Sequence, residues 1–181
     1  VERFLAGYLR RIDVVTSYEA RLLGPGGTLL KHRERLCDDD FLVAHADNFS
    51  AIDWARFVTA HRERPSRCVG TMMTFVTDDP RSCGIVETDA EGVLKVMHEK
   101  VAEPPGNLAN AAVFLFSPQV FDIISDIRGD AVIDISRDII PRLLGRLATF
   151  QTSGYHRDIG TPESLANARR DFEEIDRSRT E

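Results

Sequence analysis

The chain of 181 residues has a formal net charge of −6, and 43% of its residues are hydrophobic. This is enough for one sizeable core, so we expect a single domain over residues 1–181. Acidic and basic residues are mixed throughout, which disfavours nucleic acid or an anionic membrane as the main partner, because both require a basic stripe. The longest purely apolar run, 111–116, is too short to span a bilayer. We expect a soluble, cytoplasmic protein without a signal peptide.

The cysteines are odd in number and form no C-x-x-C pair. They are Cys37, Cys68 and Cys83. This pattern favours reduced structural thiols over a disulfide framework or a zinc site.

The first part of the chain predicts a helix over residues 1–8 and a buried strand over 12–17, where β-branched residues gather. Residues 23–28 predict a glycine-rich loop that leads into a helix ending near Leu36. Strand, glycine loop and helix in this order bring backbone N–H groups close to a nucleotide. A tight turn is the alternative interpretation, since glycines beside a proline often form one.

Residues 41–44 predict a short apolar strand that ends in the sequence H-A-D-N. Asp47 therefore lies at the carboxyl end of a strand, where open α/β sheets place their ligands. Ser50 and Asp53 form a capping-box pattern at the start of a helix. His61 lies on the apolar face of that helix, and we interpret it as a packed histidine rather than a ligand.

The remaining elements alternate between strands and helices. Strands are predicted at 68–76, 110–116, 146–152 and 155–158, a hairpin at 84–100, and helices at 117–127 and 135–144, the second ended or kinked near Pro141. This alternation predicts an α/β fold with a Rossmann-like, doubly wound, mostly parallel sheet and a small β-rich insertion.

The segment 158–163, D-I-G-T-P-E, follows a predicted strand and opens a helix. Thr161 suits the N-cap, and Pro162 suits the first helical position, where its missing N–H costs nothing. Asp158 would be held by rigid elements on both sides, at a point where a phosphate or metal ion could bind. The alternative is that Asp158 only helps the helix to start.

Several short motifs in this order resemble the sugar-1-phosphate nucleotidyltransferases, and the resemblance covers nearly the whole chain. The motifs are Asp47 after a strand, Gly84 at a hairpin, the pair Glu99-Lys100, Asn110 at a strand start and Asp158 in D-I-G-T-P-E. The segment 19–27, E-A-R-L-L-G-P-G-G, is similar to the family loop that receives the nucleotide base. It makes Gly24, Gly26 and Gly27 candidate nucleotide-binding residues.

The resemblance implies transfer of a nucleotidyl group from a nucleoside triphosphate to a sugar 1-phosphate, with release of pyrophosphate. GTP with mannose or heptose 1-phosphate is favoured, and uridylyl or thymidylyl transfer to glucose 1-phosphate is the alternative. Asp47 and Asp158 would be catalytic and would hold a Mg²⁺ ion that aligns the phosphates.

The sugar 1-phosphate would be bound by the middle part of the chain. The resemblance implies that Lys100 is catalytic and binds its phosphate, and that Glu99, Asn110 and the backbone N–H of Gly84 form the sugar pocket. A solvated ion pair at a strand end is the alternative for Glu99 and Lys100 taken alone.

Some positions depart from the family pattern. Val101 follows Lys100 where the family has E-K-P, Ala112 stands where Asn-Ala-Gly is usual, and Pro25 stands where threonine is common.

Nothing in the sequence matches the family's first strand and its G-x-G-T-R loop, which binds the triphosphate. We expect the fold to lack both, the natural protein to be longer, and this chain alone to be inactive. The missing strand would lie between the strands at 12–17 and 41–44.

Two other classes of protein fit parts of the sequence. The triplet Asp38-Asp39-Asp40 is compatible with a metal-dependent glycosyltransferase, but it precedes its strand, as a solvated acidic turn would. A catalytically silent regulatory subunit that binds an NDP-sugar would keep the sugar pocket and lack the triphosphate loop. The expected ligands are a nucleoside triphosphate and a sugar 1-phosphate, and a homo-oligomer remains open.

Overall fold

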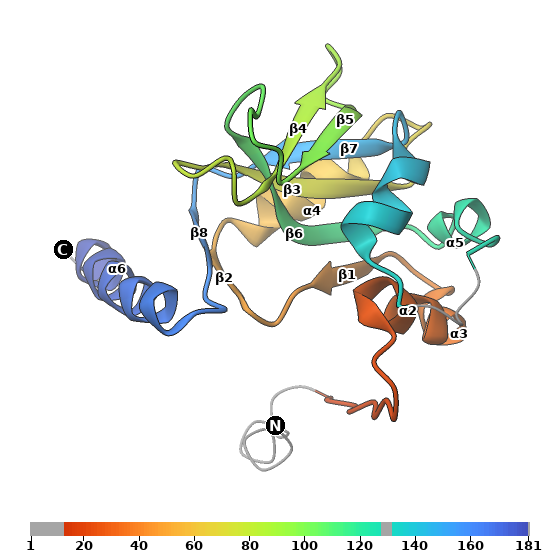
Figure 1. Ribbon diagram of the computed structural model, residues 1–181, viewed down its shortest axis with the longest axis horizontal. Helices are drawn as coiled ribbons and strands as arrows, with labels where there is room; N and C mark the ends of the chain where they lie inside the picture. The colour runs from red at the N-terminus through yellow and green to blue at the C-terminus, as the bar shows by residue number, and fades with distance from the viewer. Residues whose placement is uncertain (1–12, 128–131, 181) are drawn as a thin grey trace.

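The computed structural model describes residues 13–127 and 132–180. A six-stranded sheet lies at its centre, and a two-stranded sheet next to it carries the C-terminal helix (Figure 1). The helices are α2 (Gly24–Lys31), α3 (Arg33–Leu36), α4 (Trp54–Arg62), α5 (Val120–Ile123), η1 (Ile135–Ile139), η2 (Ile140–Leu143) and α6 (Pro162–Thr180). The strands are β1 (Phe41–Ala44), β2 (Asn48–Ala51), β3 (Gly70–Val76), β4 (Gly84–Thr88), β5 (Leu94–Glu99), β6 (Leu108–Phe116), β7 (Leu147–Gln151) and β8 (Tyr155–Asp158).

The six strands have the order β5-β4-β6-β3-β7, and β1 lies beside β6. β6 is central because β3 pairs along one of its edges while β1 and β4 share the other. Only β3 and β7 are parallel neighbours among the described strands. β1, β3, β4 and β7 nevertheless share one direction, because β6 and β5 run against them.

The α/β class is as predicted, but most neighbouring strand pairs are antiparallel. Four strands run in one direction, as a mostly parallel sheet requires. Most of them are nevertheless not hydrogen-bonded to one another, because the antiparallel β6 lies between them. Short apolar strands carry no sequence signal for direction, since parallel and antiparallel partners bury the same residue types.

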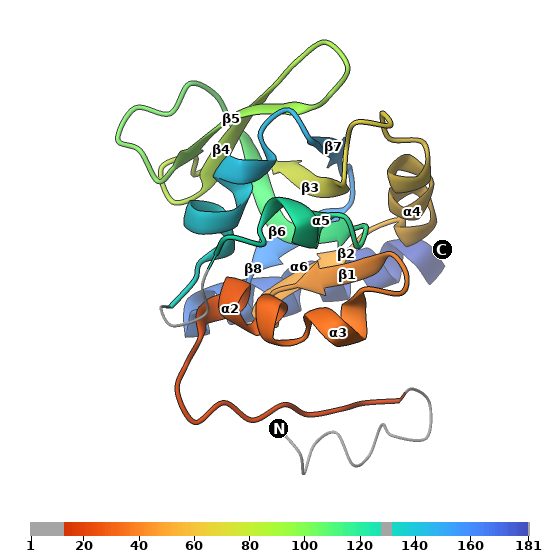
Figure 2. The same cartoon turned by 90° about the vertical axis from the view of Figure 1, so that its right-hand side faces the viewer.

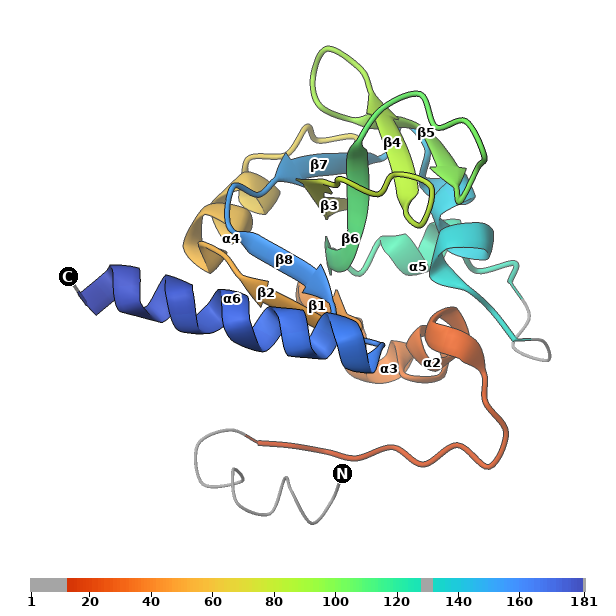
Figure 3. The same cartoon turned by 60° about the vertical axis from the view of Figure 1, so that its left-hand side comes forward.

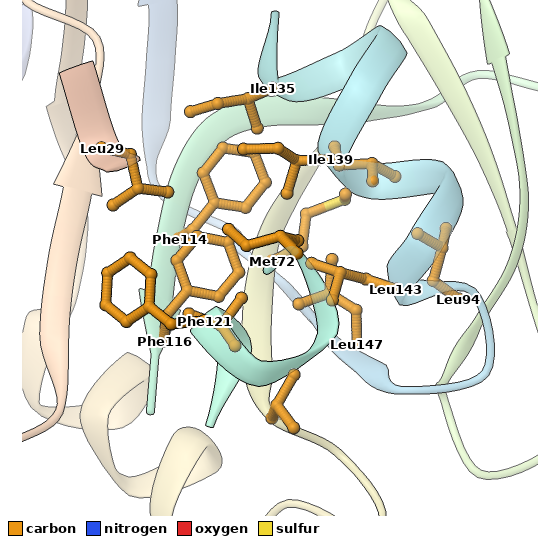
Figure 4. Packing of buried hydrophobic residues seen from close by; sticks show 14 of the residues in the cluster. Leu29, Met72, Leu94, Phe114, Phe116, Phe121, Ile135, Ile139, Leu143 and Leu147 are labelled. Carbon is orange, nitrogen blue, oxygen red and sulfur yellow. The ribbon is translucent and has the colours of Figure 1, made fainter. Parts of the chain in front are cut away.

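Helices cover both faces of the large sheet, as a doubly wound arrangement requires. Neighbouring residues of β3 point to opposite faces, so Met72 and Met73 belong to different clusters. Met73 packs with Phe57 of α4 on one face. On the other face Phe114, whose ring stacks on that of Phe116 at 5.4 Å, packs against residues of α2, α5, η1 and η2 (Figure 4).

Residues 13–20 do not form the predicted buried strand. They run apart from the sheet, and the side chain of Val15 is 72% exposed (Figure 2). Lys31 and His32, at the end of α2, bond to Ser17. A β-branched run forms a strand only beside another strand, and the described chain offers none here. The helix predicted over residues 1–8 lies outside the described residues.

Four further local predictions need correction. The glycine segment is the first turn of α2 and not a loop before it. Ser50 lies in β2, which was not predicted, and the N-cap of α4 is Asp53, whose side chain accepts from the N–H of Arg56. The helix at 117–127 shortens to α5. The helix predicted at 135–144 is a π turn followed by a 3-10 turn with Pro141 near the junction, where proline removes a donor.

α6 lies along the β2–β8 pair (Figure 3). The Tyr155 hydroxyl of β8 donates to Asp171 of α6 at 2.6 Å, and Arg157 forms an ion pair with the same carboxylate at 3.2 Å. Thr161 caps the helix as predicted, since its Oγ1 accepts from the N–H of Ser164. None of the helices among the described residues is long and apolar enough to cross a membrane.

Candidate functional site

A gap between β1 and β4, along the edge of β6 that they share, is the centre of the candidate site. Beyond the end of β1, the N–H of His45 donates to the carbonyl of Ala112. Near the start of β4, Ile85 pairs with Ala109. Residues 110–112 of β6 therefore lie between the end of β1 and the start of β4. The segment after β1 and the segment before β4 are thereby held close together.

Residues 110–112 form a bulge. The pairing of β3 with β6 shifts register here, and Ala112 has a φ of +52°. The Asn110 Oδ1 accepts from the N–H of Ala112 at 2.9 Å, and Asn48 donates from Nδ2 to the carbonyl of Ala111 at 3.1 Å. Asn110, which is predicted to bind sugar, thus stabilises the backbone of the bulge. Asn48 stabilises it too, and the sequence did not predict this role although Asn48 directly follows Asp47.

We expect Ala112→Gly to leave stability unchanged or to raise it by up to about 1 kcal/mol, because a left-handed φ penalises alanine and not glycine. Ala111→Gly is the matched control. Its methyl group is buried, so its loss should cost about 1 kcal/mol. Urea unfolding of both variants measures the difference, and equal losses would show that the bulge carries no strain.

The carboxylates of Asp47 and Asp158 face one space. β2 and β8 pair with Asn48 opposite Asp158, and the N–H of Ile159 donates to the carbonyl of Asp47 at 2.7 Å. A methyl group added to Gly160 would lie 3.0 Å from Asp158 Oδ1 and 3.5 Å from Asp47 Oδ2. Both oxygens therefore lie within 3.5 Å of one point, which the lack of a side chain at Gly160 keeps open.

Two carboxylates that face one open space are ligands of the kind that Mg²⁺ uses, and the magnesium ion at this site stays a prediction. The described residues contain no group of three or more His, Cys, Asp or Glu side chains that could hold a metal. Mg²⁺ is commonly bound by one or two carboxylates, with waters and substrate phosphates completing its octahedron. The Asp158 Oδ1 also accepts from the N–H of Gly160 at 2.7 Å, which fixes this carboxylate.

Gly84, Glu99 and Lys100 lie together at the β4 side of the gap. Gly84 pairs with Glu99, and a methyl group on Gly84 would lie 2.8 Å from Glu99 Oε2, so glycine makes room for this side chain. Lys100 has a φ of +50°, and its N–H donates to the carbonyl of Cys83. A left-handed residue thus turns the chain just before Val101, where the resembled family has proline.

Two clefts adjoin the gap. One, of about 750 Å³, is lined among others by Thr77, Cys83, Asn107, His156, Asp158 and Ser164. The other, of about 1040 Å³, lies between α2 and the end of β1 and is lined among others by Pro25, Thr28, His32, His45 and Asp47. Asp158 lines the first cleft and Asp47 lines the second, beside the predicted base loop. Among the described residues that line the two clefts, none is one of the predicted sugar-binding residues Gly84, Glu99, Lys100 and Asn110.

The glycines predicted to bind nucleotide allow close packing. A methyl group on Gly26 would lie 2.6 Å from the Cγ2 of Ile133, and one on Gly24 would lie 2.5 Å from the carbonyl oxygen of the same residue. Gly27 is buried against Leu23. It is Pro25 and Thr28, between and beside them, that line the cleft. Nucleotide binding by the glycines themselves stays a prediction.

Glu19 holds the start of α2 in place. Its carboxylate accepts from the Thr28 hydroxyl at 2.8 Å and from the N–H of Leu23 at 3.2 Å. The Thr28 hydroxyl bond is the main reason why the pKa of Glu19 lies below its ordinary value. The spacing of E-x-x-L-L-G thus lets Glu19 clamp the start of the helix.

Asp40, the last residue of the acidic triplet, contacts the buried His61. Asp40 Oδ2 lies 3.2 Å from His61 Nε2, and the other ring nitrogen of this buried histidine bonds to Thr71. Burial lowers the pKa of His61, and this agrees with a packed histidine.

All three cysteines are free thiols, as predicted.

His156 is a residue of the candidate site that the sequence interpretation missed. Its Nδ1 bonds to the Ser50 hydroxyl at 2.8 Å, and its ring contacts that of Phe75 at 4.6 Å between centroids. Burial lowers its pKa from 6.5 to about 4, although the charge of Asp158 acts in the opposite direction. The cleft beside Asp158 is therefore lined by a neutral histidine at neutral pH.

We expect stability to fall as pH decreases from about 6.5 to about 4. In this window the unfolded chain binds a proton at His156 that the folded chain does not, so protons favour unfolding. The lowered pKa of His61 acts in the same direction. Melting temperatures above and within this window should fall less steeply for His156→Gln than for the parent chain. Identical slopes would rule out this contribution.

Comparisons with known proteins identify the relatives of this chain. A family model described as "Nucleotidyl transferase" matches residues 4–175. The chain is 30% identical over 166 residues to a mannose-1-phosphate guanylyltransferase from Mycobacterium tuberculosis, covering 90% of this chain and 44% of the relative. It is 32% identical over 137 residues to a glucose-1-phosphate adenylyltransferase from Thermomicrobium roseum, covering 71% of this chain and 31% of the relative.

Solved structures show the same fold. A proposed glucose-1-phosphate thymidylyltransferase from Bacillus anthracis, in complex with a sucrose, superimposes with a TM-score of 0.78 at 21% identity, covering 92% of this chain and 68% of that one. HddC from Yersinia pseudotuberculosis, complexed with GMP-PN, gives a TM-score of 0.69 at 20% identity over 94% of this chain and 74% of that one. The chain spans less than half the length of the two curated relatives named above.

Proposed function

We propose that this chain, which belongs to the nucleotidyl transferase family, contributes to guanylyl transfer from GTP to mannose 1-phosphate or heptose 1-phosphate. An oxygen of the sugar phosphate would bond to the α-phosphorus of GTP. The bond from that phosphorus to the oxygen bridging to the β-phosphate would break, and its electron pair would leave with pyrophosphate. Such a transfer needs positioning and charge neutralisation more than covalent help from the protein.

The convergence of Asp47 and Asp158 carries this proposal. Two carboxylate oxygens within 3.5 Å of one open point suit a Mg²⁺ ion that also binds phosphate oxygens. When bound, the ion would withdraw charge from the phosphates during transfer. The N–H of Ile159 donates to the carbonyl of Asp47 and so joins the two segments. The N–H of Gly160 donates to the carboxylate of Asp158 and fixes its position.

The sugar 1-phosphate would occupy the cleft on the β4 side. Lys100 supplies a cation for its phosphate, and Glu99 supplies an acceptor for its hydroxyl groups. The neutral ring of His156 and the thiol of Cys83 line the same cleft as Asp158. The nucleotide would occupy the cleft between α2 and the end of β1, which Thr28 and Asp47 both line.

Mannose and GTP are favoured by the guanylyltransferase relatives from Mycobacterium tuberculosis and Yarrowia lipolytica. Glucose 1-phosphate with another nucleotide is the second candidate. The adenylyltransferase relative and the thymidylyltransferase fold neighbour favour it. Ala112 stands where the resemblance leads one to expect glycine. Its methyl group would change the shape of the gap and thereby which sugar fits.

The test is pyrophosphate release with Mg²⁺ across GTP, UTP, dTTP, ATP and CTP, each with mannose, heptose and glucose 1-phosphates. It should be run on this chain and on any longer polypeptide that contains it. Release that requires both GTP and mannose or heptose 1-phosphate supports the proposal. Release only with glucose 1-phosphate selects the second candidate. Tight binding of an NDP-sugar without release in any version would select the silent regulatory subunit.

A further inference from the structure

A closed network of polar side chains joins α6 to β8 just before the proposed metal ligand Asp158. The Tyr155 hydroxyl donates to Asp171 Oδ2 at 2.6 Å, and Arg157 Nε donates to the same hydroxyl at 2.7 Å. The guanidinium of Arg157 also pairs with Asp171 Oδ2 at 3.2 Å. Each of the three groups therefore bonds to the other two, and two of the three belong to the strand that ends at Asp158.

The strand pair that brings the two proposed metal ligands together has little support of its own. β2 and β8 have four residues each and form a sheet separate from the six-stranded one. A two-stranded sheet is marginally stable in water unless a helix or further strands pack on it. α6 supplies this packing, and the ring of Phe49 on β2 lies 5.4 Å from that of Phe172 on α6 (Figure 3). Phe172 remains 41% exposed, so the aromatic contact is partial and the polar network adds to the attachment.

The turn between β8 and α6 connects this network to the proposed metal site. Only residues 159–161 lie between the last residue of β8 and the first residue of α6. Within the turn, the N–H of Ile159 donates to the carbonyl of Asp47, and Gly160 leaves open the point that both carboxylates face. A displacement of α6 on β8 would therefore move the turn and change the distance between the two carboxylates.

We propose that Tyr155, Arg157 and Asp171 are positioning residues, which hold α6 on β8 and thereby keep the carboxylates of Asp47 and Asp158 directed at one metal ion. They act through the backbone of β8 and the turn that follows it, and not as ligands. The inference rests on the proposed function, because it takes Asp47 and Asp158 as the metal ligands. It adds a group of residues, outside the pair of ligands, that sets the affinity of the site.

Tyr155→Phe tests the inference with the smallest change, because it removes one hydroxyl and two bonds of the network while the ring that contacts Phe49 stays. We expect the folded variant to bind Mn²⁺ about threefold to tenfold more weakly, as the loss of about one net hydrogen bond predicts. Asp171→Ala should weaken binding further, and Asp171→Asn, which keeps an acceptor for the Tyr155 hydroxyl, should recover part of it. Titration followed by electron paramagnetic resonance measures the affinity, and at saturation the signal of the bound ion should broaden as its ligand geometry becomes less uniform.

Asp126→Asn is the matched control. Asp126 pairs with Arg142 at 3.2 Å, as Asp171 pairs with Arg157, but it lies outside α6 and the β2–β8 pair. This variant should bind Mn²⁺ as tightly as the parent chain. Parent-like affinity in Tyr155→Phe, or an equal loss in Asp126→Asn, would overturn this inference and leave the metal site standing. Absence of Mn²⁺ binding by the folded parent chain would overturn the metal site as well.

Discussion

Replacing Asp158 with asparagine is expected to lower pyrophosphate release by at least about 100-fold. A catalytic metal supplies several kcal/mol of transition-state stabilisation, and the variant removes one of the two charges proposed to hold it. Asparagine keeps an oxygen that can accept from the N–H of Gly160, so the turn before α6 should survive. The effect should therefore appear in turnover and not in the melting temperature.

Asp78→Asn is the matched control for this prediction. Asp78 is an exposed carboxylate on the wall of the same cleft, so its replacement removes an equal charge from the same surroundings. Its rate should stay within a few-fold of that of the parent chain. A comparable drop in both variants would mean that the general negative charge of the cleft, and not a specific ligand, supports the reaction. The assay applies to whichever version of the protein turns over.

Phe114→Ala is expected to destabilise the protein by about 3–5 kcal/mol, the usual cost of truncating a fully buried phenylalanine. Phe114 is 0% exposed and lies on β6 between β1 and β3, which pair with it on either side. Since a domain has only about 5–15 kcal/mol of stability in total, the variant should be close to unfolding.

Leu42→Ala on β1 is the control for the core substitution. Leu42 is 49% exposed, and truncation there should cost less than about 1 kcal/mol. Urea unfolding of both variants gives the comparison. A loss at Leu42 as large as that at Phe114 would mean that the outer face of β1 is buried in solution by a contact absent from the described chain.

Local signals were sufficient for several elements. The strand at 41–44 and the hairpin start at Gly84 lie where predicted, because each is a short apolar run bounded by turn residues. The N-cap of α6 at Thr161 followed from a pattern of four residues. Such features depend on residues near one another in the chain.

Features that depend on distant partners could not be predicted in this way. β2 forms because β8 pairs with it, and Ser50 bonds to His156 instead of capping a helix. The strand expected at 12–17 is absent among its described residues because no strand edge meets it. Asp47 and Asp158 became candidates through their places at a strand end and before a helix start and through the resemblance to a family. Only the β2–β8 pairing explains why their carboxylates face one point.

The most direct test of the account is a titration of this chain with Mn²⁺, followed by the electron paramagnetic resonance signal of the free ion. The parent chain should bind one ion at this site, and Asp47→Asn and Asp158→Asn should each abolish that binding. Gly160→Ala, which adds a methyl group beside both oxygens without needing a positive φ, should weaken it about tenfold while the protein stays folded. Undiminished Mn²⁺ binding in either asparagine variant would contradict the claim that the two carboxylates hold one metal ion.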